Sequence, residues 1–227
     1  YAALNAFICL PLHFWITRQN RKTRIGNGSR GKPVIGTLAP EMYRLAQILV
    51  AAAFGIQGFT LSAILTHMVP MLGSLGLGTL AVLIGVAFGP SQAVSRLATM
   101  LFTKNMSPST LATLSSVFLV AGTFVLTLVG NWVPGAILFA IFLGLGSGIS
   151  SIAQGALPLW LFGSVGYGAI SGKINAARLI AASTAPFIFA LMMEHLGTPL
   201  ALLINSIVGL VGIVAFVALS KLAKRSH

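Results

Sequence analysis

Residues 133–157 read VPGAILFAIFLGLGSGISSIAQGAL, a run without a charged side chain. Such a run has about the length that a helix needs to cross the hydrocarbon core of a membrane, which is roughly 30 Å thick. The rest of the chain has the same character, because 56% of its 227 residues are hydrophobic and 7% are charged. A soluble domain carries about a quarter of charged residues. The sequence therefore predicts an all-α integral membrane protein.

Seven apolar segments can be drawn along the chain, at roughly 1–17, 44–71, 76–101, 108–129, 133–157, 173–194 and 198–220. We interpret 1–17 as the end of a transmembrane helix, 18–43 as a basic linker, 44–220 as a bundle of six helices and 221–227 as a tail. The chain begins at Tyr1 without a methionine, and we expect it to be a fragment of a longer protein.

The 14 basic residues indicate an orientation. If the linker is cytoplasmic and the segments alternate, every Lys and Arg falls at a cytoplasmic end, as is typical of helical membrane proteins. The outer loops near 72–76, 130–134 and 195–199 carry none. This predicts a multi-pass protein with a cytoplasmic C-terminus. For the linker, a lipid-facing loop that sets topology is favoured over a site for nucleic acid or an acidic partner.

Three stretches resemble one family: HMVPMLGSLG (67–76), GPSQAVSR (89–96) and LPLWLFGSVGYGAISG (157–172), the last as a loop between helices. In order and spacing they are similar to the C-terminal half of major facilitator superfamily (MFS) transporters, with 1–17 as the end of the sixth helix. The resemblance implies an MFS-type bundle in a bacterial inner membrane and a missing N-terminal half of six helices. It also implies proton-coupled secondary transport of a small solute by alternating access. The sequence departs from the cytoplasmic motif of that family, because GPSQAVSR has no acidic residue before Arg96.

GPSQAVSR contains the first group of candidate residues. Pro90 removes a backbone donor and predicts a kink, while Gly89 would let another backbone approach. Arg96 has two interpretations: a gate that works with this hinge, or a side chain that extends to the lipid headgroups. Gln92 is four residues earlier on the same face, and we expect it to face the solute pathway.

A second group lies in KINAARLIAASTAPF (173–187). Asn175 and Arg178 share a face, and Pro186 is expected to interrupt the helix. A charged residue inside a membrane helix normally faces protein or a water-filled cavity. Arg178 either binds an anionic solute or pairs at the gate, and the alternative is again contact with headgroups.

The remaining candidates lie in the segments 44–71 and 133–157. Gln57 is a pathway candidate near mid-segment, with an interhelical hydrogen bond as its structural alternative, and Phe54 and Thr60 would share its surface. Gln154 would line the inner vestibule, and His67 is a candidate for proton coupling that competes with a role as an ordinary interfacial histidine. Gly144 and Gly148 form a small-residue stripe suited to close helix contact.

Several functions are excluded by what the sequence lacks. The two acidic residues, Glu41 and Glu194, fall on opposite sides of the membrane, and no cluster has the spacing of metal ligands. No strand precedes the glycine-rich runs, so a dinucleotide site is not expected either. We therefore predict that the protein is not an enzyme and binds neither a metal nor a cofactor. We expect a transporter of a small organic anion that contacts membrane lipids. The alternatives are a multidrug-type efflux pump and a non-transporting scaffold, and we expect the 227 residues alone not to transport.

Overall fold

The computed structural model describes residues 11, 15, 33–103 and 106–225. The chain divides into two units, Tyr1–Pro33 and Val34–His227, and the long helices formed by the described residues lie in the second. Apart from Pro11 and Trp15, the expected first segment and the linker residues 18–32 lie outside the described residues. Residues 104–105 and the last two residues of the tail do so as well.

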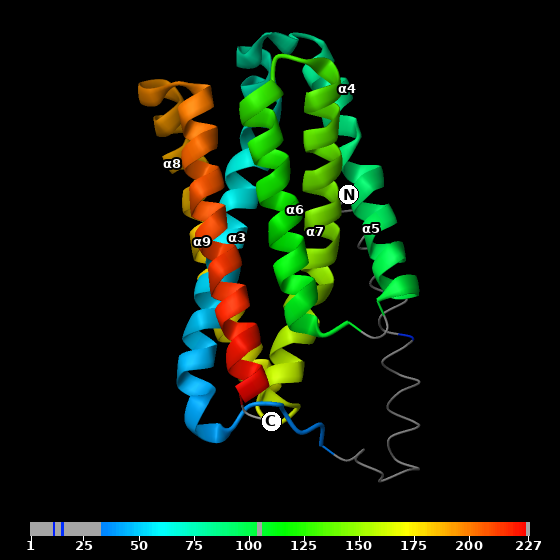
Figure 1. Ribbon diagram of the computed structural model, residues 1–227, viewed down its shortest axis with the longest axis vertical. Helices are drawn as coiled ribbons and strands as arrows, with labels where there is room; N and C mark the ends of the chain where they lie inside the picture. The colour runs from blue at the N-terminus through cyan, green and yellow to red at the C-terminus, as the bar shows by residue number, and fades with distance from the viewer. Residues whose placement is uncertain (1–10, 12–14, 16–32, 104–105, 226–227) are drawn as a thin grey trace. The chain divides into compact units, whose positions relative to one another are not determined.

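The described part of the second unit contains helices and no strand, which confirms the all-α prediction. The elements are η2 (Pro40–Met42), α3 (Tyr43–Leu72), the π-helical turn η3 (Gly73–Leu77), α4 (Leu80–Val86), α5 (Phe88–Phe102), α6 (Pro108–Val129), α7 (Val133–Phe162), α8 (Tyr167–Leu196) and α9 (Thr198–Arg225) (Figure 1). Within this part, six helical segments are long and apolar enough to cross a membrane, with α4 and α5 together forming one of them.

The connection between α7 and α8 is much shorter than the loop expected at 157–172. Helix α7 continues to Phe162 and α8 begins at Tyr167, so only residues 163–166 connect them. Gly163 and Gly166 have φ angles of 75° and 69°, which side chains rarely adopt and which turn the chain sharply. Most of the expected loop is thus helical, with Pro158 buried inside α7.

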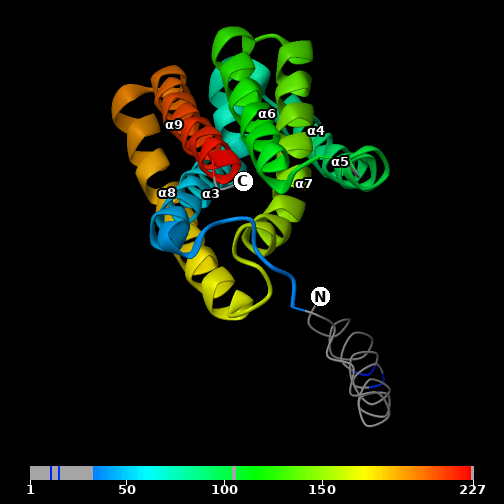
Figure 2. The same cartoon turned by 60° about the horizontal axis from the view of Figure 1, so that its bottom comes forward.

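The six membrane-length segments form an arc in which most helices pack on two neighbours. Going around the arc, the order is α8, α3, α9, α6, α7 and α5, and the first and last of these each have one principal neighbour (Figure 2). Helices α3 and α7 contact each other little, and so do α7 and α8. One side of the arc, between α8 and α5, is therefore less filled than the rest of the bundle.

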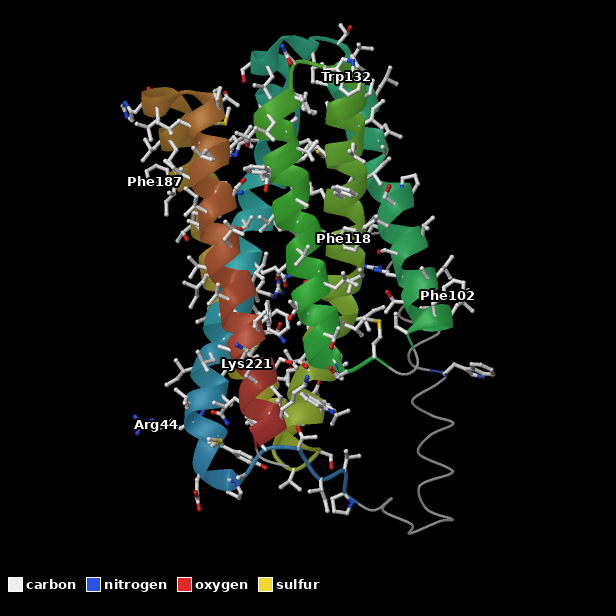
Figure 3. The ribbon with its side chains drawn as sticks, viewed as in Figure 1. Arg44, Phe102, Phe118, Trp132, Phe187 and Lys221 are labelled. Carbon is white, nitrogen blue, oxygen red and sulfur yellow. The ribbon has the colours of Figure 1, made fainter. Side chains whose placement is uncertain are left out.

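Basic and aromatic side chains mark the two ends of the bundle. Arg44 and Lys221 lie toward the end where α3 begins and α9 ends, whereas Trp132 lies at the opposite end, before α7 begins (Figure 3). This separation agrees with the alternation of helix directions on which the expected orientation rests.

Glycines bring α5 and α7 into close contact. A Cβ on Gly144 would lie 2.5 Å from the carbonyl oxygen of Phe88, and one on Gly148 would lie 2.5 Å from that of Gln92 and closer still to Ser95 Oγ. Small residues permit such approach between membrane helices, where van der Waals contact replaces a hydrophobic driving force. The stripe expected from the sequence thus forms the contact with α5.

Two prolines have opposite effects on their helices. Pro90 follows a break at Ala87, where the N–H of Ala87 donates to the carbonyl of Ile84 three residues earlier (3.1 Å). Pro186, in contrast, lies inside an uninterrupted α8, so the expected interruption there is wrong. Its missing N–H would have bonded the carbonyl of Ala182, and Ser62 Oγ on α3 donates to that oxygen instead (2.7 Å).

The last part of the expected linker is bound to the end of α7. The N–H groups of Thr37 and Leu38 donate to the carbonyls of Trp160 and Leu161 at 3.1 and 3.2 Å, and the N–H of Ser164 donates to the carbonyl of Val34 at 2.9 Å. The last carbonyls of a helix have no partner within it. Residues 34–38 therefore complete α7 and are part of the bundle.

The contact between α5 and α7 leads to a stability prediction. Gly148→Ala should lower the free energy of unfolding by about 1–3 kcal/mol, because the added methyl group overpacks the contact. Gly155→Ala in the same helix is the control, because its Cβ would meet no atom within 4 Å. Thermal unfolding in detergent measures both variants, and equal stability of the two would contradict the close contact.

Candidate functional site

A cavity of about 380 Å³ lies among α3, α7 and α8, on the less filled side of the arc. This volume is in the range of small-molecule sites, which is about 300–1,000 Å³. Its wall combines polar and apolar side chains. The lining residues are Gln57, Gly58, Leu61, Ser62, Leu65, Thr66, Ser150, Gln154, Arg178 and Ala182.

The cavity lies at the middle of the bundle. Gly58 is 15 residues after the first residue of α3 and 14 before the last, so each end of the helix is about 22 Å away. Helix α3 is one of the segments long and apolar enough to cross a membrane, and a bilayer centred on it would have its middle near Gly58. Polar side chains at that depth are costly unless they are paired or meet water.

Gln57 is the centre of a hydrogen-bond network that joins three helices. Its Nε2 donates to Ser115 Oγ (2.8 Å) and Ser116 Oγ (2.9 Å) on α6, and its Oε1 accepts from Ser150 Oγ (2.7 Å) on α7. Ser150 Oγ in turn accepts from Gln154 Nε2 (3.0 Å). Each residue of the network therefore donates to the next, from Gln154 at the cavity through Ser150 and Gln57 to the serines of α6.

The amide of Gln57 has little left to offer a solute. Both its donor hydrogens and its oxygen are engaged, and only 5% of the residue is exposed. Ser115 also donates its own hydrogen to the carbonyl of Ala112, which closes the network on α6 (2.8 Å). These bonds favour the structural interpretation of Gln57, although its side chain forms part of the cavity wall.

Among the residues that the structure describes, Arg178 is the only charged one that lines the cavity. Its side chain crosses α3 at Gly58, where an added Cβ would lie 2.8 Å from Arg178 Cγ. Nε is 3.5 Å from Asn175 Oδ1, the long limit of a hydrogen bond. Contact with Gly58 places the stem of Arg178 beside the middle of α3, and the residue lies about 17 Å along α8 from Tyr167, which favours the cavity over the headgroups.

Other expected pathway residues lie elsewhere. Phe54 is fully buried against Phe216 of α9, with ring centres 5.1 Å apart, and it does not line the cavity. Thr60 borders a separate cavity of about 10 Å³ beside Gly209 and Gly212, which has room for one water but not for a solute. Of the expected pathway residues, the larger cavity brings together Gln57, Gln154 and Arg178.

The expected hinge and gate residues lie on α5, outside this cavity. Gln92 Nε2 donates to Ser147 Oγ on α7 (2.7 Å), so its amide joins two helices. Gly89 and Pro90 are exposed beside the break at Ala87, and no atom lies within 4 Å of a Cβ on Gly89. Within the described part of the chain, no backbone makes the close approach expected at Gly89. Arg96 is exposed.

His67 lies near the C-terminal end of α3, outside the cavity. Its Nδ1 is 3.1 Å from the carbonyl oxygen of Ala63, one turn earlier, and its ring centre is 5.7 Å from that of Phe189 on α8. The side chain therefore contributes to packing between α3 and α8.

Four hydroxyl residues of the site are absent from the sequence-based expectations. Ser115 and Ser116 are adjacent in the middle of an apolar segment, a signal that would have marked them as partners for a buried amide. Ser62 and Thr66 follow Gly58 at intervals of four residues and thus share its face of α3. That spacing predicts a small and polar stripe, which is the stripe that faces α8 and the cavity.

In the part of the chain that the structure describes, no group of three His, Cys, Asp or Glu side chains is placed to hold a metal ion. Comparison of the sequence with protein-family models and curated proteins, and of the structure with solved structures, found no match.

The network predicts that Gln57 stabilises the bundle. Gln57→Leu keeps the volume but removes three interhelical hydrogen bonds, and we expect the free energy of unfolding to fall by about 1–2 kcal/mol. Gln47→Leu, a half-buried position in the same helix, is the matched control and should change stability little. Thermal unfolding in detergent gives the comparison. A Gln57→Leu protein as stable as the control variant would refute the structural role of the network.

Proposed function

We propose that the protein is a secondary active transporter that moves a small solute by alternating access. The observation that carries this proposal is the cavity at mid-depth, which holds a charged side chain within a bundle of membrane-length helices. Ionisable groups inside a membrane mark solute or ion pathways. In secondary transporters the solute site lies near the middle of the bilayer.

The arc of helices supports an MFS-type arrangement as part of this proposal. Helices α5 and α8 each have one principal neighbour, so much of their surface is exposed. A second half of six helices, as the resemblance implies, would cover the open side and enclose the cavity. Positive charge at the end where α9 finishes supports a cytoplasmic C-terminus in a bacterial inner membrane.

The proposal includes coupling to an ion gradient, with the proton as the ion that the resemblance implies. No carboxylate lines the cavity in the described residues. A coupling acid would therefore come from the second half, with His67 as the titratable candidate in this one. His67 contacts Phe189 on α8, the helix that carries Arg178.

Two alternatives rest on weaker support. An efflux pump for drug-like compounds would use a mostly apolar and aromatic surface, whereas this cavity contains two amides, three hydroxyl side chains and a guanidinium. A scaffold has no use for a polar cavity of this size at mid-depth, where unpaired polar groups cost free energy. The first observation favours a small polar solute over a drug-like one, and the second favours transport over a scaffold role.

Alternating access predicts that the cavity is reached from both sides of the membrane. In a Cys9→Ser background, Ala182→Cys places a thiol on the cavity wall, close to Gly58. In vesicles containing the natural, full-length polypeptide, we expect a membrane-impermeant maleimide to label this thiol from either side at comparable rates. Mass spectrometry of the labelled protein measures the rates.

The control is Ala185→Cys, which lies less than one turn later on α8 but is fully buried and away from the cavity. It should remain unlabelled from both sides. Labelling of Ala182→Cys from one side only, whatever the conditions, would favour a static scaffold and overturn the proposed function.

A further inference from the structure

We infer that the solute is a small monocarboxylate whose carboxylate group binds Arg178. This inference rests on the proposed function, because it names the solute class for the same cavity. It comes from three features of the site: the unpaired charge of Arg178, the groups around it and the number of charges in the cavity.

Arg178 has no acidic partner within reach. The sequence contains two acidic residues, and both lie at helix ends. Glu194 is 16 residues further along α8, about 24 Å away along the axis, and Glu41 precedes Gly58 by 17 residues, about 26 Å. A positive charge at mid-depth without a partner is unfavourable. An anion that enters the cavity would remove that cost.

The guanidinium group suits a carboxylate in shape. Its planar set of donors forms paired hydrogen bonds with the two oxygens of a carboxylate. Asn175 accepts from Nε at most weakly, so the terminal nitrogens of Arg178 remain to bind a ligand. Packing of the side-chain stem on Gly58 holds the group at a defined depth, which lowers the entropy lost on binding.

The rest of the cavity wall suits a short, partly polar body. Leu61 and Leu65 offer apolar surface, and Thr66 and Gln154 offer hydrogen-bonding groups that the network around Gln57 does not fully use. In the part of the wall that the structure describes, Arg178 is the one cation, so a second carboxylate on the solute would find no cationic partner there. The cavity therefore selects a monocarboxylate with a hydroxyl or similar group over a dicarboxylate.

Lactate is a suitable probe, with lactamide as its neutral analogue of the same shape and succinate as a dicarboxylate. We would measure the thermal stability of the natural, full-length protein in detergent as each compound is added, and counterflow of labelled lactate in proteoliposomes. Lactate should stabilise the protein and exchange across the membrane, whereas lactamide should do neither and succinate should bind more weakly.

Variants assign the effect to one side chain. Arg178→Gln should weaken lactate binding roughly 10- to 100-fold, because it removes hydrogen bonds to a charged group. Arg178→Lys keeps the charge without the fork, and it should retain part of the affinity and show that the position tolerates substitution. Arg44→Gln is the matched control, since Arg44 is exposed near the start of α3 and does not line the cavity.

The outcomes separate this inference from the proposed function. Equal effects of lactate and lactamide, or unchanged lactate binding in Arg178→Gln, would overturn the monocarboxylate assignment. Transport of a sugar or a cationic dye without any carboxylate would also overturn it, while the transporter proposal would stand. If the thiol at residue 182 is reached from one side only and none of these compounds is transported, the inference and the proposed function are both overturned.

Discussion

The hydrogen bonds of Gln57 are the interaction on which the rest of the bundle depends. Helices α3 and α7 have little direct contact, yet Gln57 joins α3 to both α6 and α7 at the middle of the structure. In hydrocarbon no water can replace a lost hydrogen bond of an amide, so breaking the bonds of Gln57 would cost free energy. The network thereby keeps one wall of the cavity in place without filling the space beside it.

The same rule explains how the backbone behaves at irregular positions. Where Pro186 deprives a carbonyl of its helical partner, Ser62 on the neighbouring helix replaces it and α8 continues. At the end of α7, residues 34–38 supply the missing donors. Near Pro90 the helix instead breaks at Ala87, on a segment that packs chiefly against α7 alone. At Pro186 a neighbouring donor thus replaces the lost partner of the backbone within a continuous helix.

Gln57 and Arg178 line the same cavity but differ in what they have left to bind. Every polar hydrogen of the Gln57 amide is engaged within the protein, whereas Arg178 has one long contact to Asn175. Gln57 therefore holds the wall of the site in place, whereas Arg178 has hydrogen-bond donors left to bind a ligand. The contact of Arg178 with Gly58 places its stem near the middle of α3, and secondary transporters bind their solutes near the middle of the bilayer.

The sequence by itself determined the membrane character, the helical class and most helix bounds. A helix that crosses a bilayer needs a long apolar run, and such a run is visible in the sequence without knowledge of the packing. It also marked Arg178 and Gln154 as polar groups in apolar surroundings and the Gly144–Gly148 stripe as a contact surface. Only the tertiary structure decided which groups meet. Periodicity gives the face of a helix but not its neighbour, so it could not pair Gln57 with the serines of α6 or Phe54 with Phe216. Nor could it show that Ser62 rescues the helix at Pro186, because that bond joins residues 120 positions apart.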